Sequence, residues 1–99
     1  MRRGGYVYIM SSINNTTLYV GVTSTIGARV IQHKENFYPN SFTTKYNCKK
    51  LVYYRWFDTI IEAIVEEKRI KGRSRKKKEI LINCINPRWG DLYEQVRFL

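Results

Sequence analysis

Two runs of β-branched and aromatic residues, YVYIM and LYVGV, are separated by a polar segment that contains Asn14-Asn15. β-Branched and aromatic side chains favour strands, and asparagine adopts the positive φ angles that a tight hairpin turn needs. The pattern therefore predicts a β-hairpin that closes with a two-residue turn at Asn14-Asn15. No other feature constrains the fold as strongly, because the turn also determines which residues of the two strands face each other.

Counting outward from this turn gives four opposed pairs: Met10 with Tyr19, Ile9 with Val20, Tyr8 with Gly21, and Val7 with Val22. Opposed residues share a face of the sheet, and the faces alternate along each strand. One face is therefore entirely aliphatic and is expected to contact the core. The other face places two tyrosines, Tyr8 and Tyr19, beside Met10 and Gly21.

A helical pattern follows the hairpin after a Thr-Ser-Thr cluster that is typical of helix caps. Ile26, Val30 and Phe37 recur at helical spacing and form the expected buried stripe. Arg29 and His33 are four residues apart, so they are neighbours on one side of the same helix.

The remaining chain predicts one strand and two helices. Residues 37–47 are expected to form a loop, and the run KLVYYRWF a third strand. Asp58 or Thr59 can cap a helix over residues 60–71 that stops near Gly72, and Ser74 can cap another over residues 75–83. The tail after Asn86-Pro87 is expected to be irregular. The predicted order is strand, strand, helix, strand, helix, helix, which indicates an α/β (α+β) class.

Glu67 is an anomaly of the second helix. It lies in the middle of an apolar stripe formed by Ile60, Ala63, Ile64 and Ile70. Its neighbour Glu66 is expected to point to solvent. A carboxylate on a buried face is costly unless it is paired or binds a metal. Glu67 therefore either bends to the surface or pairs with a Lys or Arg, or it is a ligand for a hard cation such as Mg²⁺.

The formal net charge of +10 favours a polyanionic partner over a membrane surface, because no segment is both strongly apolar on one face and rich in lysine on the other. A basic surface without a function is the alternative. No segment approaches the length of a membrane span, and no signal peptide is recognisable. With one histidine and no C-x-x-C motif, the two cysteines exclude a zinc finger and indicate buried free thiols. These features predict a cytoplasmic protein.

The run KRIKGRSRKKK is the densest concentration of positive charge in the chain. Its Lys and Arg side chains are candidates for sequence-independent phosphate contacts that weaken steeply with salt. A solvated helix face is the alternative. The candidates are Lys68, Arg69, Lys71, Arg73, Arg75, Lys76 and Lys77.

The unusual residues together fit one reaction. Phosphodiester hydrolysis needs an acceptor for a proton of water, a cation where negative charge develops, and an electrophilic metal. The two tyrosines, the Arg29/His33 pair and Glu67 supply residues for all three. A Ser-His-Asp arrangement is not indicated around His33.

The order of these motifs resembles the GIY-YIG nuclease superfamily, whose name describes the paired strand motifs that YVYIM and LYVGV match. The similarity is closest to its small single-domain UPF0213 members, which have counterparts of FYPNSFTTKYNCKKLVYY, EEKRIKG and NCINPRWGDL. It spans about residues 5–92, within a chain expected to be one domain over residues 1–99. The first motif departs from its name, with VY in place of IY and Tyr6 where glycine is usual.

The resemblance assigns catalytic roles to Tyr8, Tyr19, Arg29, His33 and Glu67, and positioning roles to Gly21 and Asn86. It implies a three-stranded antiparallel sheet flanked by helices that binds one Mg²⁺ or Mn²⁺ ion at Glu67. In that scheme Arg29 stabilises the transition state, and Tyr8 or Tyr19, with Tyr8 favoured, deprotonates water with help from His33. Asn86 before Pro87 can equally cap a turn.

The function expected from this resemblance is a metal-dependent DNA endonuclease, with structured or repair-related DNA as a possible substrate because excision-repair nucleases belong to the superfamily. The alternatives are a nucleic-acid-binding module without turnover and an RNA-directed nuclease. Relatives commonly carry a separate DNA-recognition domain. Without one, specificity is expected to be low or to come from a homodimer or a protein partner.

Overall fold

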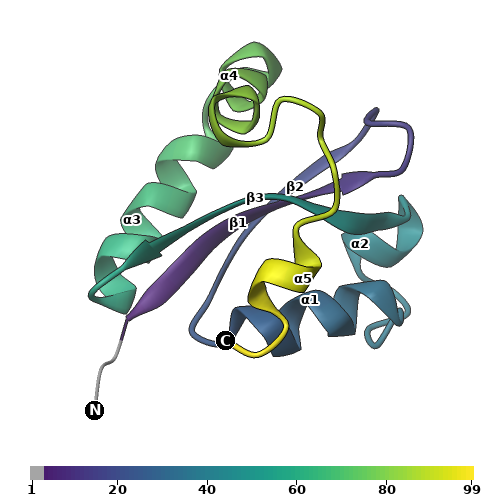
Figure 1. Ribbon diagram of the computed structural model, residues 1–99, viewed down its shortest axis with the longest axis horizontal. Helices are drawn as coiled ribbons and strands as arrows, with labels where there is room; N and C mark the ends of the chain where they lie inside the picture. The colour runs from purple at the N-terminus through teal and green to yellow at the C-terminus, as the bar shows by residue number, and fades with distance from the viewer. Residues whose placement is uncertain (1–3) are drawn as a thin grey trace.

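The structure is a computed structural model that describes residues 4–99. The described residues form a three-stranded antiparallel sheet in the order β2-β1-β3, with helices on both faces. Figure 1 shows α3 and α4 on one face of the sheet and α1, α2 and α5 on the other. This confirms the predicted fold class. The elements are β1 (Gly5–Ser12), β2 (Leu18–Thr23), α1 (Ile26–Lys34), α2 (Phe42–Lys45), β3 (Cys48–Phe57), α3 (Ile60–Lys71), α4 (Arg75–Ile85) and α5 (Tyr93–Val96).

The register of the hairpin is confirmed at all four predicted pairs. β1 and β2 pair Val7 with Val22, Tyr8 with Gly21, Ile9 with Val20, and Met10 with Tyr19. β3 pairs with the other edge of β1, so β1 is the central strand of the sheet. The face of the hairpin that carries Tyr8 and Tyr19 therefore continues onto β3, where Tyr54 pairs with Tyr8.

The prediction of a two-residue turn at Asn14-Asn15 is wrong. Asn15 has a positive φ of 61°, but Asn14 is not among the described residues with positive φ, whereas the expected turn needs both. The loop is wider because the Ser12 hydroxyl oxygen accepts hydrogen bonds from the backbone amides of Thr16 and Thr17, each at 3.1 Å. The chain still returns in the predicted register, since the Ser12 amide donates to the Thr17 carbonyl at 3.0 Å.

Helix α1 is shorter than its apolar pattern predicted. Ile26 and Val30 are buried as expected, but the helix ends at Lys34, and Asn36 adopts a φ of 55°. Phe37, predicted on the buried stripe, therefore lies beyond the helix and is 61% exposed. The positive φ turns the chain away from the helix axis before a further helical turn can form.

The segment predicted as a loop contains helix α2. Ser41 is its N-cap and accepts a hydrogen bond from the Thr44 amide at 3.3 Å. The tail after Asn86-Pro87 likewise contains a short helix, α5, instead of being irregular throughout. Both helices have four residues, a length at which hydrophobic periodicity is not visible in a sequence.

The predicted caps of the two long helices are confirmed. The side chain of Thr59 accepts from the Glu62 amide at the start of α3, and Ser74 accepts from the Lys77 amide at the start of α4. Gly72 is the C-cap of α3. Because each hydroxyl satisfies an amide that the helix itself cannot pair, the two helices begin at the expected residues.

Glu66 does not point freely into solvent, contrary to the prediction. Only 12% of its side chain is exposed, and its carboxylate contacts Arg69 at 2.5 Å and Arg55 of β3 at 3.9 Å. The two guanidinium groups explain why this acid lies against the protein surface. The hydrogen bond from Arg69, together with the positive charges of Arg69 and Arg55, holds the pKa of Glu66 below its usual value.

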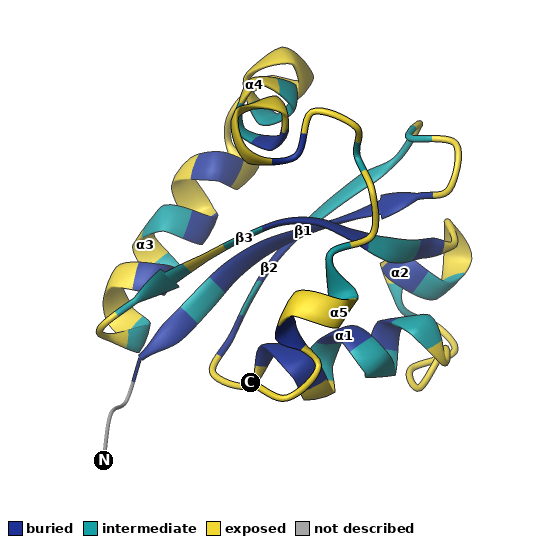
Figure 2. Cartoon of the chain, viewed as in Figure 1, coloured by how far each residue is buried: buried dark blue, intermediate teal, exposed yellow. Residues whose placement is uncertain are grey.

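The sheet has a core on each face. Val7 and Ile9 of β1 pack with Ala63 and Ile70 of α3 and with Ile82 of α4. On the opposite face, the largest fully buried residues are Tyr8 and Met10 of β1, and Ile26, Val30, Leu51 and Val96 pack around them. Figure 2 shows β1 buried along nearly its whole length between these two layers.

Cys48 is buried, whereas Cys84 is exposed on α4, which corrects the prediction that both thiols are buried. Neither thiol forms a disulfide within residues 4–99. None of the helices described is long and apolar enough to cross a bilayer.

Candidate active site

Gly21 allows two tyrosine rings to approach the backbone of β2. A Cβ atom at position 21 would lie 2.5 Å from Cζ and from the hydroxyl oxygen of Tyr8, and 2.9 Å from Cε2 of Tyr19. These distances are well inside van der Waals contact. The ring centroids of Tyr8 and Tyr19 are 6.2 Å apart, so the missing side chain lets the two rings share one site.

His33 joins this pair from helix α1. Its Nε2 atom is hydrogen-bonded to the Tyr8 hydroxyl at 2.9 Å, and its ring lies 5.5 Å from the Tyr19 ring. Its Nδ1 atom is hydrogen-bonded to Oγ1 of Thr43 in α2 at 2.8 Å. Both imidazole nitrogens therefore have partners, and the side chain is held in one orientation.

Burial and charge set the protonation of both groups. Burial, reinforced by the positive charge of Arg29, lowers the pKa of His33 to about 4, so the imidazole is neutral at pH 7. Burial raises the pKa of Tyr8 well above its ordinary value, and Tyr19 and Glu67 raise it further while Arg29 lowers it. Tyr8 is therefore a neutral phenol beside a neutral imidazole.

Arg29 and Glu67 lie near enough to Tyr8 to act on its charge, although they come from helices on opposite faces of the sheet. Arg29 is partly exposed, one helical turn before His33 on α1. Glu67 is only 7% exposed, and its Oε2 atom lies 2.6 Å from Nζ of Lys71. This ion pair by itself accounts for the burial of the carboxylate.

A hollow of about 270 Å³ opens beside Tyr19. The ring of Phe42 packs against Tyr19 with a centroid distance of 5.9 Å and forms part of the wall. Lys71, the partner of Glu67, faces the same space, so an anionic ligand here would meet ammonium groups as well as apolar surface. The lining residues are Leu18, Tyr19, Val20, Phe42, Lys71 and Lys78.

Residues 4–99 contain no cluster of three His, Cys, Asp or Glu side chains that would form a preassembled metal site. The donor set at Glu67 is one buried carboxylate, which lies near enough to Tyr8 to raise the pKa of its phenol. This set fits Mg²⁺, which is often held by one or two carboxylates and takes its other oxygen ligands from water and substrate phosphate.

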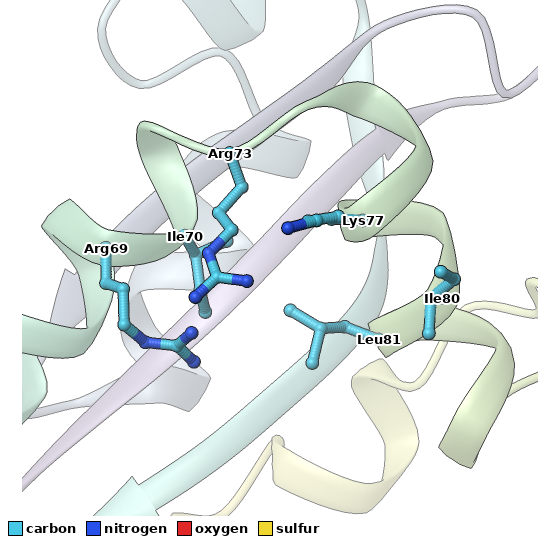
Figure 3. A pocket seen from close by; sticks show the side chains of 6 residues that line it. All are labelled: Arg69, Ile70, Arg73, Lys77, Ile80 and Leu81. Carbon is cyan, nitrogen blue, oxygen red and sulfur yellow. The ribbon is translucent and has the colours of Figure 1, made fainter.

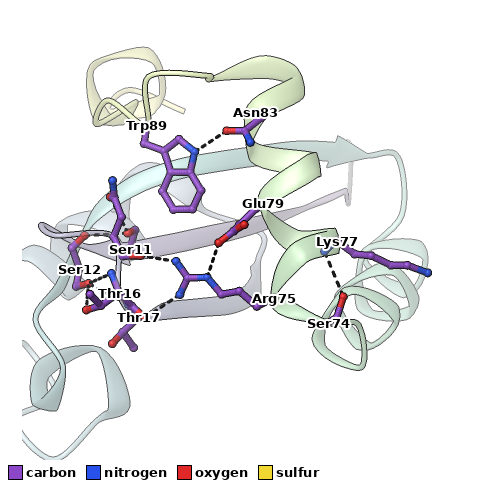
Figure 4. A network of polar contacts seen from close by, with 11 residues as sticks. Ser11, Ser12, Thr16, Thr17, Ser74, Arg75, Lys77, Glu79, Asn83 and Trp89 are labelled. Carbon is purple, nitrogen blue, oxygen red and sulfur yellow. Dashed lines mark hydrogen bonds and ion pairs between the residues drawn. The ribbon is translucent and has the colours of Figure 1, made fainter.

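The basic run divides into paired and available charges. Arg75 has a structural role: its guanidinium donates to the backbone carbonyls of Asn15 and Thr16, contacts Glu79 at 2.9 Å, and lies over the Trp89 ring. Figure 4 shows how this joins α4 to the β1–β2 loop. Arg69 and Lys71 pair with Glu66 and Glu67. In the described part of the chain, four of the seven candidates have no acidic partner within 4.0 Å: Lys68, Arg73, Lys76 and Lys77.

A second hollow, of about 260 Å³, lies between the end of α3 and α4. In Figure 3 the nitrogen atoms of Arg73 and Lys77 extend over a floor that includes Ile70 and Leu81. Arg69, which also lines this hollow, is the partner of Glu66. Available positive charge thus gathers where α3 meets α4.

Asn86 is not brought together with the tyrosines. Its side-chain amide donates to the Val52 carbonyl of β3 at 3.1 Å and to the Gly90 carbonyl at 2.8 Å. The bond to Val52 holds the end of α4 against β3, the edge strand opposite β2, and the bond to Gly90 closes the turn that follows α4. This is the turn-stabilising role that the sequence also allowed.

Sequence reasoning missed Thr43 and Phe42 because both lie in the segment predicted as a loop. Thr43 contacts His33 directly, and Phe42 contacts Tyr19. The only local signal was a serine followed three residues later by a threonine, a pattern too common to indicate a site.

Comparison with known proteins shows where this arrangement belongs. A family model of the GIY-YIG catalytic domain matches residues 4–80. The chain belongs to the GIY-YIG family. GIY-YIG domains are generally nucleases that act on nucleic acid and use a divalent metal. The matched part contains Tyr8, Tyr19, Gly21, Arg29, His33 and Glu67, whereas Asn86 lies beyond it.

Two relatives place this GIY-YIG chain among the UPF0213 proteins. It is 37% identical over 78 residues to a UPF0213 protein of Staphylococcus saprophyticus subsp. saprophyticus, a match that covers 79% of this chain and 93% of the relative. The solution NMR structure of a UPF0213 protein from Bacillus halodurans has a TM-score of 0.55 and 27% identity, covering 87% of this chain and 89% of the other. The family name does not specify a substrate.

Proposed function

We propose that the protein is a metal-dependent endonuclease that hydrolyses phosphodiester bonds in DNA. One observation carries this proposal: Tyr8 of β1, Tyr19 of β2 and His33 of α1 meet beside the gap at Gly21, although they are distant in the sequence. Tyr8 and His33 are in direct contact, the Tyr19 ring lies beside both, and Arg29 and Glu67 act on the same phenol.

Burial favours Tyr19 over Tyr8 as the group that faces the attacking water. Tyr8 is 1% exposed, has a raised pKa, and already contacts His33, so it is a poor acceptor of a proton from the substrate side. Tyr19 is partly exposed and lines the hollow. In this scheme Tyr19 accepts a proton from the water as it passes its own proton to Tyr8, whose hydrogen moves to Nε2 of His33. This reverses the preference for Tyr8 that the sequence suggested.

Positive charge is available where the reaction needs it. In this scheme Arg29 stabilises the additional negative charge of the pentacovalent transition state, which a planar guanidinium can contact through two donors at once. Lys71 faces the hollow beside Tyr19 and would meet a phosphate oxygen there.

Glu67 is the residue that would hold Mg²⁺ or Mn²⁺. A divalent cation supplies Lewis-acid polarisation of a phosphate oxygen at such a site. Glu67 is buried on α3, which packs against β1 and β2, the strands that carry Tyr8 and Tyr19. Lys71 neutralises the carboxylate in the metal-free protein and is long and flexible enough to move to the substrate.

The available cations at the junction of α3 and α4 would bind the flanking phosphates. Arg73 and Lys77 are exposed and line the hollow there, and Lys68 and Lys76 are exposed on the same two helices. These contacts are independent of sequence, so the proposed enzyme binds many DNA sequences with similar affinity. A homodimer or a protein partner remains the proposed source of any specificity.

A substrate panel tests this proposal. Supercoiled plasmid, branched DNA and single-stranded RNA are incubated with the protein in Mg²⁺, in Mn²⁺ or in EDTA. We expect DNA to be cut in the presence of metal and to remain intact in EDTA. Binding of every nucleic acid without cleavage would replace the proposal with a non-catalytic module, and cleavage of RNA alone would replace it with an RNA-directed nuclease.

A further inference from the structure

A continuous chain of hydrogen bonds leads from Tyr8 into the segment that surrounds α2. His33 Nδ1 and Thr43 Oγ1 are 2.8 Å apart, and Thr43 Oγ1 is 3.2 Å from Oγ of Ser41. The Ser41 hydroxyl donates to Oγ1 of Thr44 at 3.2 Å, and Thr44 donates to the backbone carbonyl of Tyr38 at 2.9 Å. Beginning at Tyr8, the chain therefore ends on an atom that can only accept.

This carbonyl fixes the direction of every bond before it. Thr44 gives its only hydroxyl hydrogen to Tyr38, so it accepts the hydrogen of Ser41. Ser41 then has no hydrogen left, and its contact with Thr43 requires Thr43 to be the donor. Thr43 consequently has only lone pairs to offer to His33.

We propose that Thr43 is a positioning residue that holds His33 in the tautomer with hydrogen on Nδ1. With Thr43 as acceptor, Nδ1 of His33 is the donor, and Nε2 of the neutral ring is left as an acceptor. The Tyr8 hydroxyl, 2.9 Å away, must then donate to Nε2. The polar side chains around α2 thereby determine where the hydrogen of a buried tyrosine lies.

The fixed hydrogen directs the lone pairs of Tyr8 away from His33 and toward the Tyr19 side of the site. Tyr8 then has lone pairs, and no hydrogen, to offer to Tyr19, whose ring centroid lies 6.2 Å from its own. In the opposite tautomer, Nε2 would donate to Tyr8, whose own hydrogen would be free to turn toward Tyr19. The effect of the His33 tautomer on catalysis rests on the proposed nuclease function, whereas the tautomer itself does not.

Burial makes the arrangement rigid. Thr43 is 2% exposed and His33 6% exposed, so bulk water does not compete for their hydrogen bonds. Ser41 is also the N-cap of α2, and its oxygen accepts from the Thr44 amide. The same hydroxyl therefore begins the helix and orients Thr43.

The tautomer can be measured without any assay of activity. His33 is the only histidine of the chain, so the ¹⁵N spectrum of a sample labelled at the histidine side chain contains the two ring nitrogens of one residue. At pH 7 we expect Nδ1 to have the shift of a protonated nitrogen and Nε2 that of an unprotonated one. The reverse assignment in the wild-type protein would overturn the proposal.

Two substitutions separate positioning from packing. Thr43→Val keeps the shape of the side chain but removes the acceptor, and we expect Nε2 to become protonated in a large share of molecules. Thr43→Ser keeps the hydroxyl and should retain the wild-type spectrum. An unchanged tautomer in Thr43→Val would contradict the proposal. Should Thr43→Val fail to fold, the wild-type and Thr43→Ser spectra still decide the direction of the bond.

Cleavage rates give the second readout. Hydrogen-bond partners that orient metal-bound histidines change activity by about 10–100-fold, and by analogy we expect a loss of that size in Thr43→Val and recovery in Thr43→Ser. Equal loss in both variants would contradict positioning through the hydroxyl. If the wild type cuts no substrate, the nuclease proposal fails while the NMR measurement still tests the tautomer.

Discussion

The hydroxyl of Tyr8 lies 2.9 Å from Nε2 of His33, and both side chains are buried. The hairpin supplies the phenol and the first helix supplies the imidazole, which join in one polar pair between the sheet and α1. Burial, reinforced by the positive charge of Arg29, lowers the pKa of His33 and keeps a second proton off the ring at neutral pH.

The stability of the protein should therefore fall in mild acid. His33 has a pKa of about 4 in the folded protein, against an ordinary value of 6.5, so the unfolded chain takes up the proton first. The stabilisation is present above about pH 6.5 and is lost as the pH falls toward 4, with a loss on the order of 3 kcal/mol. Urea unfolding at pH 7 and pH 4.5 measures it, and the loss should be smaller in His33→Gln. The same pH dependence in both proteins would contradict this assignment.

Gly21→Ala should damage the site and the fold together. The new methyl group would meet the Tyr8 and Tyr19 rings at 2.5 and 2.9 Å, so β2 or both rings must shift. Overpacking of this kind costs about 1–3 kcal/mol of the free energy of unfolding. Gly90→Ala is the matched control, because nothing lies within 4 Å of its Cβ position. Equal melting temperatures for the two variants would show that the rings do not need the gap.

The hairpin and the two long helices could be predicted because their signals are local. Alternation of side chains fixed the pairing of Tyr8 with Gly21 even though the turn was wrong, since a wider loop closed in the same register. The hydroxyls of Thr59 and Ser74 each act within three residues of their own position. Such short-range interactions depend little on the rest of the molecule.

The surroundings of His33 could not be predicted in the same way. A helix as short as α2 is not stable by itself, so its position depends on contacts such as that between Thr43 and His33. Glu67 was predicted as buried from periodicity, but its pairing with Lys71 was one of several alternatives. Arg75 was expected to contact phosphate, yet its partners are carbonyls of a loop far away in the sequence.

The basic run should separate into binding and structural residues by substitution. Arg73→Gln and Lys77→Gln should weaken DNA binding and each reduce the slope of log affinity against log salt by about 1, without a change in stability. Arg75→Gln should instead lower the free energy of unfolding by about 1–2 kcal/mol, because it loses its hydrogen bonds to the β1–β2 loop. Fluorescence anisotropy across a salt series and urea unfolding give the two readouts. Equal effects of all three substitutions on binding would contradict the division.

Arg29→Ala should reduce the rate of cleavage by about 10²–10³-fold, the usual effect of losing one donor that stabilises transition-state charge. It should also raise the pKa of His33, because the guanidinium helps to hold that pKa low. Single-turnover rates and an NMR titration of the imidazole measure both effects. Arg88→Ala, a change at an exposed arginine outside the site, should alter neither. An Arg29→Ala protein that cuts at the wild-type rate would remove Arg29 from the proposed site.

The most direct test of the account compares adjacent glutamates on one helix. Glu67→Gln removes the proposed metal-binding carboxylate, whereas Glu66→Gln removes a carboxylate paired with Arg69 and Arg55. The measurement is the initial rate of plasmid nicking across a Mn²⁺ series. We predict a loss of at least about 100-fold in Glu67→Gln, from several kcal/mol of lost transition-state stabilisation, and a nearly wild-type rate in Glu66→Gln. Metal-dependent cleavage by Glu67→Gln at the wild-type rate would contradict the account.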